Sequence, residues 1–215
     1  VSARDHYRES IYIFKNGDDA GNNATLAFSL HNLSLTYVRQ NEFEVALEYM
    51  SEAYNVKLRG LGADSPETAA SQHWLGNIHS ELGNYDDALS EFKGALKVRV
   101  NCFGTENCDV AKTLFGLGQV HFKVNEFPEA VECLNESLRV LRKFGHNDSD
   151  VTKAILLLGN SYQELGQYEE AKETLLEALD MIESVFGANH IDASLALFRL
   201  GICYCETNDY TESLD

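Results

Sequence analysis

Proline is scarce in this sequence, and long apolar runs are missing. Two prolines among 215 residues leave most of the chain free to form helices, because proline inside a helix removes a hydrogen bond and clashes with the preceding turn. No apolar stretch approaches the ~18 residues of a membrane span, and the first residues carry no signal-peptide pattern. We therefore expect no membrane insertion. Because 44% of the residues are hydrophobic, the chain has enough apolar surface to fold.

Basic residues are also few. The chain has 17 Lys and Arg against 34 Asp and Glu, a net charge of -17, and contains no Lys/Arg-rich run. Such a surface repels phosphate backbones and anionic lipid, so we expect no binding to nucleic acid or to membrane surfaces. The simplest interpretation is a solvated acidic surface, and the alternative is electrostatic steering of a basic partner.

The five cysteines form no recognisable framework. Their number is odd and they are scattered, which predicts a reducing compartment and a cytoplasmic location. Cys102 and Cys108 flank one turn and are the one pair that could approach for a disulfide. Cys203 and Cys205 lie two residues apart on an expected helix, where side chains point in different directions, so they do not suggest a shared metal.

Catalytic motifs are missing as well. The sequence has no glycine-rich phosphate loop, nucleophile elbow or zinc-finger spacing, and its acidic residues occur as surface pairs such as Asp86-Asp87. His31 and His73 are expected one repeat apart, roughly 10 Å, which is too far for one metal ion. We therefore predict no enzyme activity, no cofactor and no metal site.

What the sequence does contain is an internal repeat of 41 or 42 residues. The repeat is marked by leucines at Leu33, Leu75, Leu117, Leu158 and Leu200. A small residue follows each leucine, at Ser34, Gly76, Gly118, Gly159 and Gly201. An aromatic residue stands ten positions after each leucine, at Phe43, Tyr85, Phe127, Tyr168 and Tyr210. Small residues let two helices approach closely, and an aromatic after the turn fills the space between antiparallel helices.

The turns repeat in the same register. Eight residues after each leucine stands Gly or Asn, the residues that tolerate a left-handed backbone: Asn41, Gly83, Asn125, Gly166 and Asn208. The longer turns carry Gly62, Gly104, Gly145 and Gly187. Pro66 and Pro128 fall where a first helical turn should begin, and Ser65 and Asn107 are suitable N-cap residues.

These signals predict an all-α chain of helix pairs without strands. The expected helices are Ala3–Lys15, Thr25–Gln40, Phe43–Arg59, Pro66–Leu82, Tyr85–Val100, Cys108–Val124, Phe127–Lys143, Asp150–Leu165, Tyr168–Val185 and Ile191–Thr207, with a further stub from Asp209. We expect one array over 1–215, with a partial repeat 1–23, repeats about 24–65, 66–107, 108–148 and 149–190, and a partial repeat 191–215. The chain begins without Met and stops inside a helical pattern, so we expect a fragment of a longer protein.

Two segments, LGNIHSELGNYDDAL (Leu75–Leu89) and LGNSYQELGQYEEAK (Leu158–Lys172), resemble the tetratricopeptide repeat. The 42-residue period, with LGADSPETA (Leu61–Ala69) or FGTENCDVA (Phe103–Ala111) after the second helix, is similar to the longer repeat of kinesin light chains and nephrocystin-3-like proteins. The resemblance implies a solenoid of antiparallel helix pairs in a right-handed superhelix that binds short peptides, such as motor-cargo signals. Kinesin light chains commonly carry paired asparagines before the repeat leucine, and here only Asn32 matches.

In that fold the first helix of each pair lines the concave groove, and the residue two after the repeat leucine should point into it. Asn77, Gln119 and Asn160 occupy that position in consecutive repeats. A side-chain amide both donates and accepts, so this ladder could pair with the backbone of an extended peptide. Lys112 and Lys153 stand at a second groove position, and together with Lys123 they predict a basic strip suited to an acidic peptide.

The spacing partly resembles the clamp by which chaperone-binding tetratricopeptide domains hold a carboxylate. Asn77 and Lys153 match that clamp and His73 takes its first lysine position, whereas Gly116 and Leu157 replace two other members. Trp74, the single tryptophan, is either a peptide anchor or a packing residue.

The predicted function is a scaffold or adaptor that binds a protein or peptide in the groove, with kinesin-light-chain-like cargo binding as one form of it. One alternative is an architectural subunit or spacer in a large assembly. Another is a regulatory repeat domain of a larger signalling enzyme.

Overall fold

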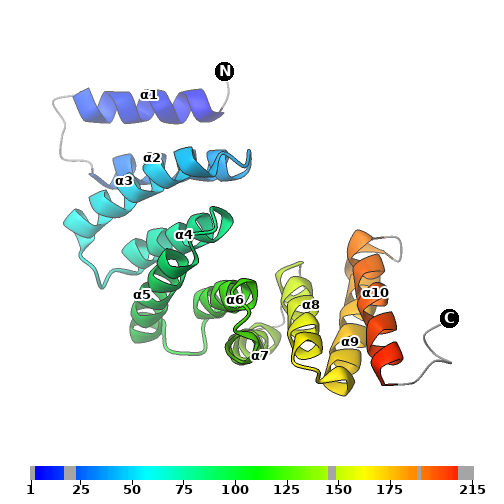
Figure 1. The fold of residues 1–215 in the computed structure, drawn as a ribbon. Helices are drawn as coiled ribbons and strands as arrows, with labels where there is room; N and C mark the ends of the chain where they lie inside the picture. Colours follow the sequence, from blue (N-terminus) through cyan, green and yellow to red (C-terminus); the bar gives the residue numbers. More distant parts are fainter. Residues whose placement is uncertain (1–2, 17–22, 145–148, 188–189, 208–215) are drawn as a thin grey trace. The chain divides into compact units, whose positions relative to one another are not determined.

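The computed structural model describes residues 3–16, 23–144, 149–187 and 190–207, and every element in these ranges is an α-helix (Figure 1). The ten helices are α1 (Ala3–Asn16), α2 (Asn23–Val38), α3 (Phe43–Leu61), α4 (Pro66–Glu81), α5 (Tyr85–Phe103), α6 (Cys108–Lys123), α7 (Phe127–Lys143), α8 (Ser149–Glu164), α9 (Tyr168–Phe186) and α10 (Ile191–Glu206). Each begins and ends within three residues of its expected bounds. The stub expected from Asp209 lies outside the described residues.

The helices pack in sequential pairs, as the repeat predicts. In the first compact unit, Val1–Thr105, α2 packs against α3 and α4 packs against α5. In the second unit, Glu106–Asp215, α6 packs against α7 and α8 against α9, and α10 packs against α9. The first helices α6 and α8 also touch each other, as do α8 and α10. The right-handed superhelix and the single array over 1–215 stay predictions.

At Gly76, Gly118 and Gly159 the small residue allows the two helices of a pair to approach, which confirms the inferred packing role for these three repeats. A Cβ added to Gly76 would lie 2.9 Å from ring carbons of Phe92. A Cβ at Gly118 would lie 2.8 Å from Leu134 Cγ. Real Cβ atoms do not approach other carbons this closely, so these positions admit no side chain without rearrangement.

The turn residues adopt the predicted left-handed conformation wherever they are described. Within the helix pairs, φ is 58° at Asn41, 79° at Gly83, 63° at Asn125 and 72° at Gly166. Asn208 lies outside the described residues. Both expected N-caps are confirmed as well. The Ser65 side chain accepts a hydrogen bond from the Glu67 amide, and the Asn107 side chain accepts one from the Asp109 amide. The two prolines lie in the first turns of α4 and α7, as expected.

Buried hydroxyls tie paired helices together. Ser34 Oγ on α2 donates to the Ala46 carbonyl on α3 over 2.7 Å. In the second unit, Ser137 Oγ on α7 donates to the Ala111 carbonyl on α6, also over 2.7 Å. Both serines are fully buried, so each bond satisfies a hydroxyl that would otherwise cost free energy in the core.

Candidate peptide-binding surfaces

The second unit brings two predicted amides onto adjoining first helices. Gln119 lies on α6 and Asn160 at the same register on α8, and these helices touch. Lys112 precedes Gln119 by seven residues and Lys153 precedes Asn160 by seven, a spacing that places both members of each pair on one helix face. Each helix therefore presents a lysine and an amide two turns apart.

The lysines of this surface are exposed. Lys112 and Lys153 form no ion pair with any acidic side chain in the part of the chain that the structure describes. Lys123, four residues beyond Gln119 on the same face of α6, is also exposed and already has an interaction within the chain. Lys112 and Lys153 therefore place two uncompensated positive charges on adjoining helices of a chain whose net charge is -17, and together they make a local basic site.

Asn160 has an unsatisfied polar atom. Its Oδ1 is buried and accepts no hydrogen bond from the described residues. A buried acceptor without a donor costs about 1–3 kcal/mol, so this amide does not improve the stability of α8. An unsatisfied group at a predicted binding position is consistent with a role other than packing.

The basic site does not continue to the carboxyl ends of α8 and α10. A hollow of about 490 Å³ lies there, with Glu164, Tyr168, Ile202 and Glu206 among its lining residues. Arg199 Nη1 lies 3.5 Å from Glu164 Oε1, which leaves Glu206 as a second carboxylate at this end. Ile202 holds the register position of Gln119 and Asn160, so the amides end at α8, as the sequence indicates.

The first unit holds the remaining predicted residues on α4. Asn77 Nδ2 lies 3.1 Å from His73 Nε2 and donates to the His73 carbonyl over 3.2 Å. Trp74 is half-buried against the core cluster around Leu75 and meets the His73 ring edge-on, with 6.1 Å between centroids. Trp74 thus packs within its own unit, and Asn77 is already engaged by its neighbour one turn away.

A hollow between α2, α3 and α4 was not anticipated from sequence. It has a volume of about 330 Å³ and a mostly apolar lining that includes Phe28, His31, Lys57 and Leu61. Burial and the nearby Lys57 ammonium lower the pKa of His31 to about 4. The sequence does hold a signal for this hollow. At the repeat position of Lys57, the following repeats have Arg99, Leu141 and Ile182. Comparing the second helices position by position would therefore have singled out Lys57.

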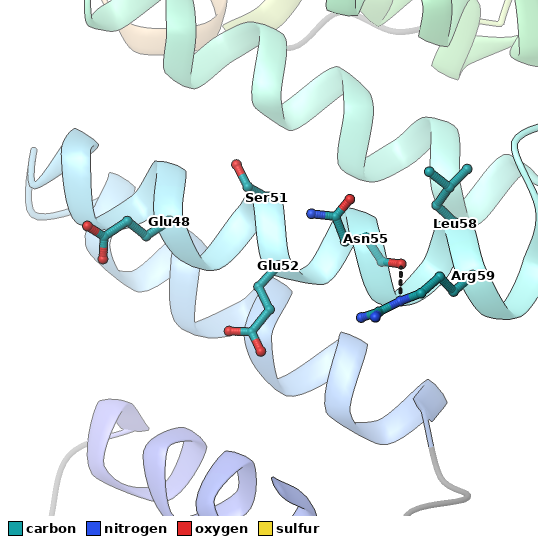
Figure 2. A pocket seen from close by; sticks show the side chains of 6 residues that line it. All are labelled: Glu48, Ser51, Glu52, Asn55, Leu58 and Arg59. Carbon is teal, nitrogen blue, oxygen red and sulfur yellow. Dashed lines mark hydrogen bonds between the residues drawn. The ribbon is translucent and has the colours of Figure 1, made fainter.

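A further hollow, of about 530 Å³, runs along α3 alone, and Figure 2 shows its six lining side chains: Glu48, Ser51, Glu52, Asn55, Leu58 and Arg59. Arg59 Nε donates to the Asn55 carbonyl over 3.2 Å. Glu52 Oε1 lies 2.6 Å from Lys15 Nζ on α1. Because Glu52 and Arg59 already interact within the chain, Glu48 is the one charged side chain among the described lining residues left for a ligand, and this open surface offers little to hold one.

Metal and membrane features are not found in the described residues. No group of three His, Cys, Asp or Glu side chains there could hold a metal ion. No helix among them is long and apolar enough to cross a bilayer. The five cysteines are free, and Cys203 is buried whereas Cys205 is exposed, as their spacing predicts.

Sequential helix pairs, closed by left-handed Asn or Gly and packed through glycines, define a helical repeat protein. Family models described as "Tetratricopeptide repeat" match residues 67–143 and 151–215, and a second such model matches residues 27–67. The chain therefore belongs to the tetratricopeptide repeat family, whose domains typically mediate protein–protein interactions and usually are not catalytic. No curated protein sequence matches the chain.

Solved structures share the fold at low identity. BtubC (BKLC) from P. vanneervenii is 17% identical, with 98% of this chain and 85% of that chain covered and a TM-score of 0.80. A structure of nearly identical TPR-like repeats from Podospora anserina, from a protein described as a kinesin light chain, is 19% identical, with coverages of 86% and 88% and a TM-score of 0.73. A Rap protein complexed with Competence and Sporulation Factor is 17% identical, with coverages of 99% and 61% and a TM-score of 0.70.

Proposed function

We propose that this domain is an adaptor that binds an extended, acidic peptide segment along its first helices, in the concave groove typical of the family. The observation that carries the proposal is the pairing of lysine and amide on both α6 and α8. Lys112 and Lys153 supply uncompensated positive charge, and Gln119 and Asn160 supply groups that can pair with a peptide backbone.

The unsatisfied Oδ1 of Asn160 supports the same interpretation. A residue selected only for packing at this position would be apolar, as Ile202 is at the equivalent position of α10. Two of the similar structures are kinesin-light-chain-like, and the Rap structure contains a peptide factor. Binding of motor cargo is the narrower form of the proposal. The cytoplasmic location also belongs to it, and rests on the cysteine pattern.

An architectural role is the second candidate. It is favoured by α10, which exposes Ile191, Leu195, Leu197 and Phe198, an apolar surface of the kind that packs against another protein.

The charge component is tested with two double variants of the whole chain. A fluorescein-labelled pool of Asp/Glu-rich decapeptides should bind the native protein, and Lys112→Glu with Lys153→Glu should weaken binding about tenfold or more, because two attractive charges become repulsive. Lys93→Glu with Lys97→Glu on α5 adds the same charge at exposed positions and should have little effect. If both double variants lost the same affinity, the loss would come from net charge alone, and the proposed site at Lys112 and Lys153 would be refuted.

The amides are tested separately. Gln119→Ala with Asn160→Ala should weaken peptide binding while leaving the urea midpoint unchanged or raised, since the replacement removes an unsatisfied buried oxygen. Asn101→Ala, an exposed asparagine on α5, is the matched control. Undiminished affinity in the double variant would assign the peptide to another surface.

A further inference from the structure

The hollow between α2, α3 and α4 contains a cation at a position where the fold does not need one. Lys57 is the fifteenth residue of α3, and the same register on α7 and α9 is taken by Leu141 and Ile182. Those two side chains are 3% and 0% exposed, so the position belongs to an apolar core in the second unit. Lys57 is half-buried, and an ammonium there loses part of its hydration, which a leucine would not need, so packing alone does not account for Lys57.

Lys57 has a neutral partner rather than an acidic one. Its Nζ donates to Ser71 Oγ on α4 over 2.8 Å. No carboxylate of the described residues lies within ion-pair distance of that Nζ. An ammonium has three donors, and the hydrogen bond to Ser71 uses one of them.

Two other titratable groups face the hollow. Glu67 is exposed, and its Oε2 accepts a hydrogen bond from Ser65 Oγ over 2.6 Å, which lowers the pKa of the carboxyl. His31 Nδ1 lies 3.5 Å from Ser71 Oγ. Since burial and the Lys57 ammonium lower the pKa of His31 to about 4, this ring is neutral at pH 7 and does not compete for an anion. Burial lowers the pKa of Lys57 as well, and Glu67 acts in the opposite direction.

The remaining lining is hydrocarbon. Ala24 and Phe28 come from α2, Leu61 from α3 and Ala70 from α4, and both Phe28 and Leu61 are more than half exposed. A second hollow, of about 260 Å³, is also lined by Lys57 and Leu61. The Lys57 ammonium therefore borders a hollow whose lining, apart from Glu67 and His31, is apolar.

We propose that this hollow binds a small apolar monocarboxylate, with its carboxylate on Lys57 Nζ and its hydrocarbon part against Phe28 and Leu61. The negative charge supplies the acceptor that Lys57 lacks, and the hydrocarbon covers apolar side chains that are exposed to water. An internal peptide segment fits less well, because its N–H and C=O groups would need partners that Ala24, Phe28, Leu61 and Ala70 do not offer. This site is independent of the peptide surface on α6 and α8.

Isothermal titration calorimetry with the whole chain at pH 7.5 tests the site with 3-phenylpropionate and its amide, 3-phenylpropanamide. The acid should bind at least about tenfold more tightly than the amide, because the two differ only in the charged group. Amide-proton NMR should place the shifts at Ala24, Phe28 and Lys57. Equal affinity for acid and amide, or shifts confined to α6 and α8, would overturn the proposal, as would binding of phenylalanine-ended peptides without binding of the free acid.

Substitutions at Lys57 give a second test. Lys57→Met keeps the length of the side chain and removes its charge, at a position that holds the apolar Leu141 in a later repeat. This variant should lose the preference for the acid over the amide. Lys57→Arg should keep that preference, and Lys93→Met, at an exposed lysine of α5, should leave both affinities unchanged. A Lys57→Met protein that retained native helicity and the acid preference would show that another group holds the carboxylate.

Discussion

Two glycines at the same repeat position should respond to alanine with opposite signs. Gly118 on α6 faces Leu134, which is fully buried, and an added Cβ would lie 2.8 Å from its Cγ and 2.9 Å from its Cδ2. Gly201 on α10 has nothing within 4 Å of the equivalent Cβ among the described residues. Both glycines are in helices of the second unit, so the comparison holds backbone conformation and register constant.

The magnitudes follow from two competing effects. Replacing glycine by alanine inside a helix stabilises by about 1 kcal/mol, because alanine loses less backbone entropy on folding. Overpacking a filled core costs about 1–3 kcal/mol. We therefore expect Gly201→Ala to raise the free energy of unfolding by about 0.5–1 kcal/mol and Gly118→Ala to lower it by about 1 kcal/mol.

Urea unfolding followed by circular dichroism measures both variants, and a constant slope with denaturant is needed for the midpoints to be compared. Leu134→Ala provides the control, and it should be destabilising alone. The double variant with Gly118→Ala should lose less free energy of unfolding than the sum of the two single losses, because the smaller side chain at position 134 removes the clash. Stabilisation by Gly118→Ala equal to that by Gly201→Ala would refute the close approach of α6 and α7.

Two further predictions concern backbone and protonation. Gly166→Val should destabilise by about 1 kcal/mol or more, because φ at Gly166 is 72° and a branched side chain clashes there. Gly166→Asn should be much milder, because Asn41 and Asn125 adopt the same conformation in other repeats. Equal urea midpoints for the two variants would contradict this prediction. The pKa of His31 is 6.5 in the unfolded chain and about 4 in the folded protein, so between these pH values the unfolded chain binds more protons. The free energy of unfolding should therefore decrease as pH falls from about 6.5 to 4, by at most about 3 kcal/mol. His31→Phe, which copies Phe115 of a later repeat, should flatten that dependence in urea titrations at pH 4 to 7, and an unchanged slope would show that other groups cause it.

The helix positions could be predicted because the glycine and asparagine residues of the turns recur at fixed spacing. The remaining errors have local causes. The α3 helix ends at Leu61 rather than Arg59, because the Gly62 amide still donates to the Leu58 carbonyl and so extends the regular hydrogen bonding to the glycine itself. The α5 helix likewise reaches Phe103, with the Gly104 amide bonded to the Val100 carbonyl. In these longer turns the helix thus ends at the residue directly before the glycine.

The candidate sites were less accessible to sequence reasoning. Helical spacing is enough to place Lys112 and Gln119 on one face of α6, because that relation is internal to a helix. It does not reveal that the Asn77 amide is taken by His73 or that Asn160 Oδ1 is buried, since both depend on rotamers and on how neighbouring helices are rotated. Trp74 could not be assigned from sequence for the same reason, and its contacts with the core appear only in the structure.

Repeats that share a fold need not share chemistry, and their differences locate function. Where the second unit has Leu141 and Ile182 in the core, the first unit has Lys57 and Arg99, so the helix pair folds with either type of residue. Arg99 is only 5% exposed and has interactions within the chain, which makes it a structural cation. Lys57 lines a hollow and contacts a neutral hydroxyl. Because the apolar alternative is available to this fold, a lysine that gives up hydration without a carboxylate partner is best explained by a ligand that supplies one.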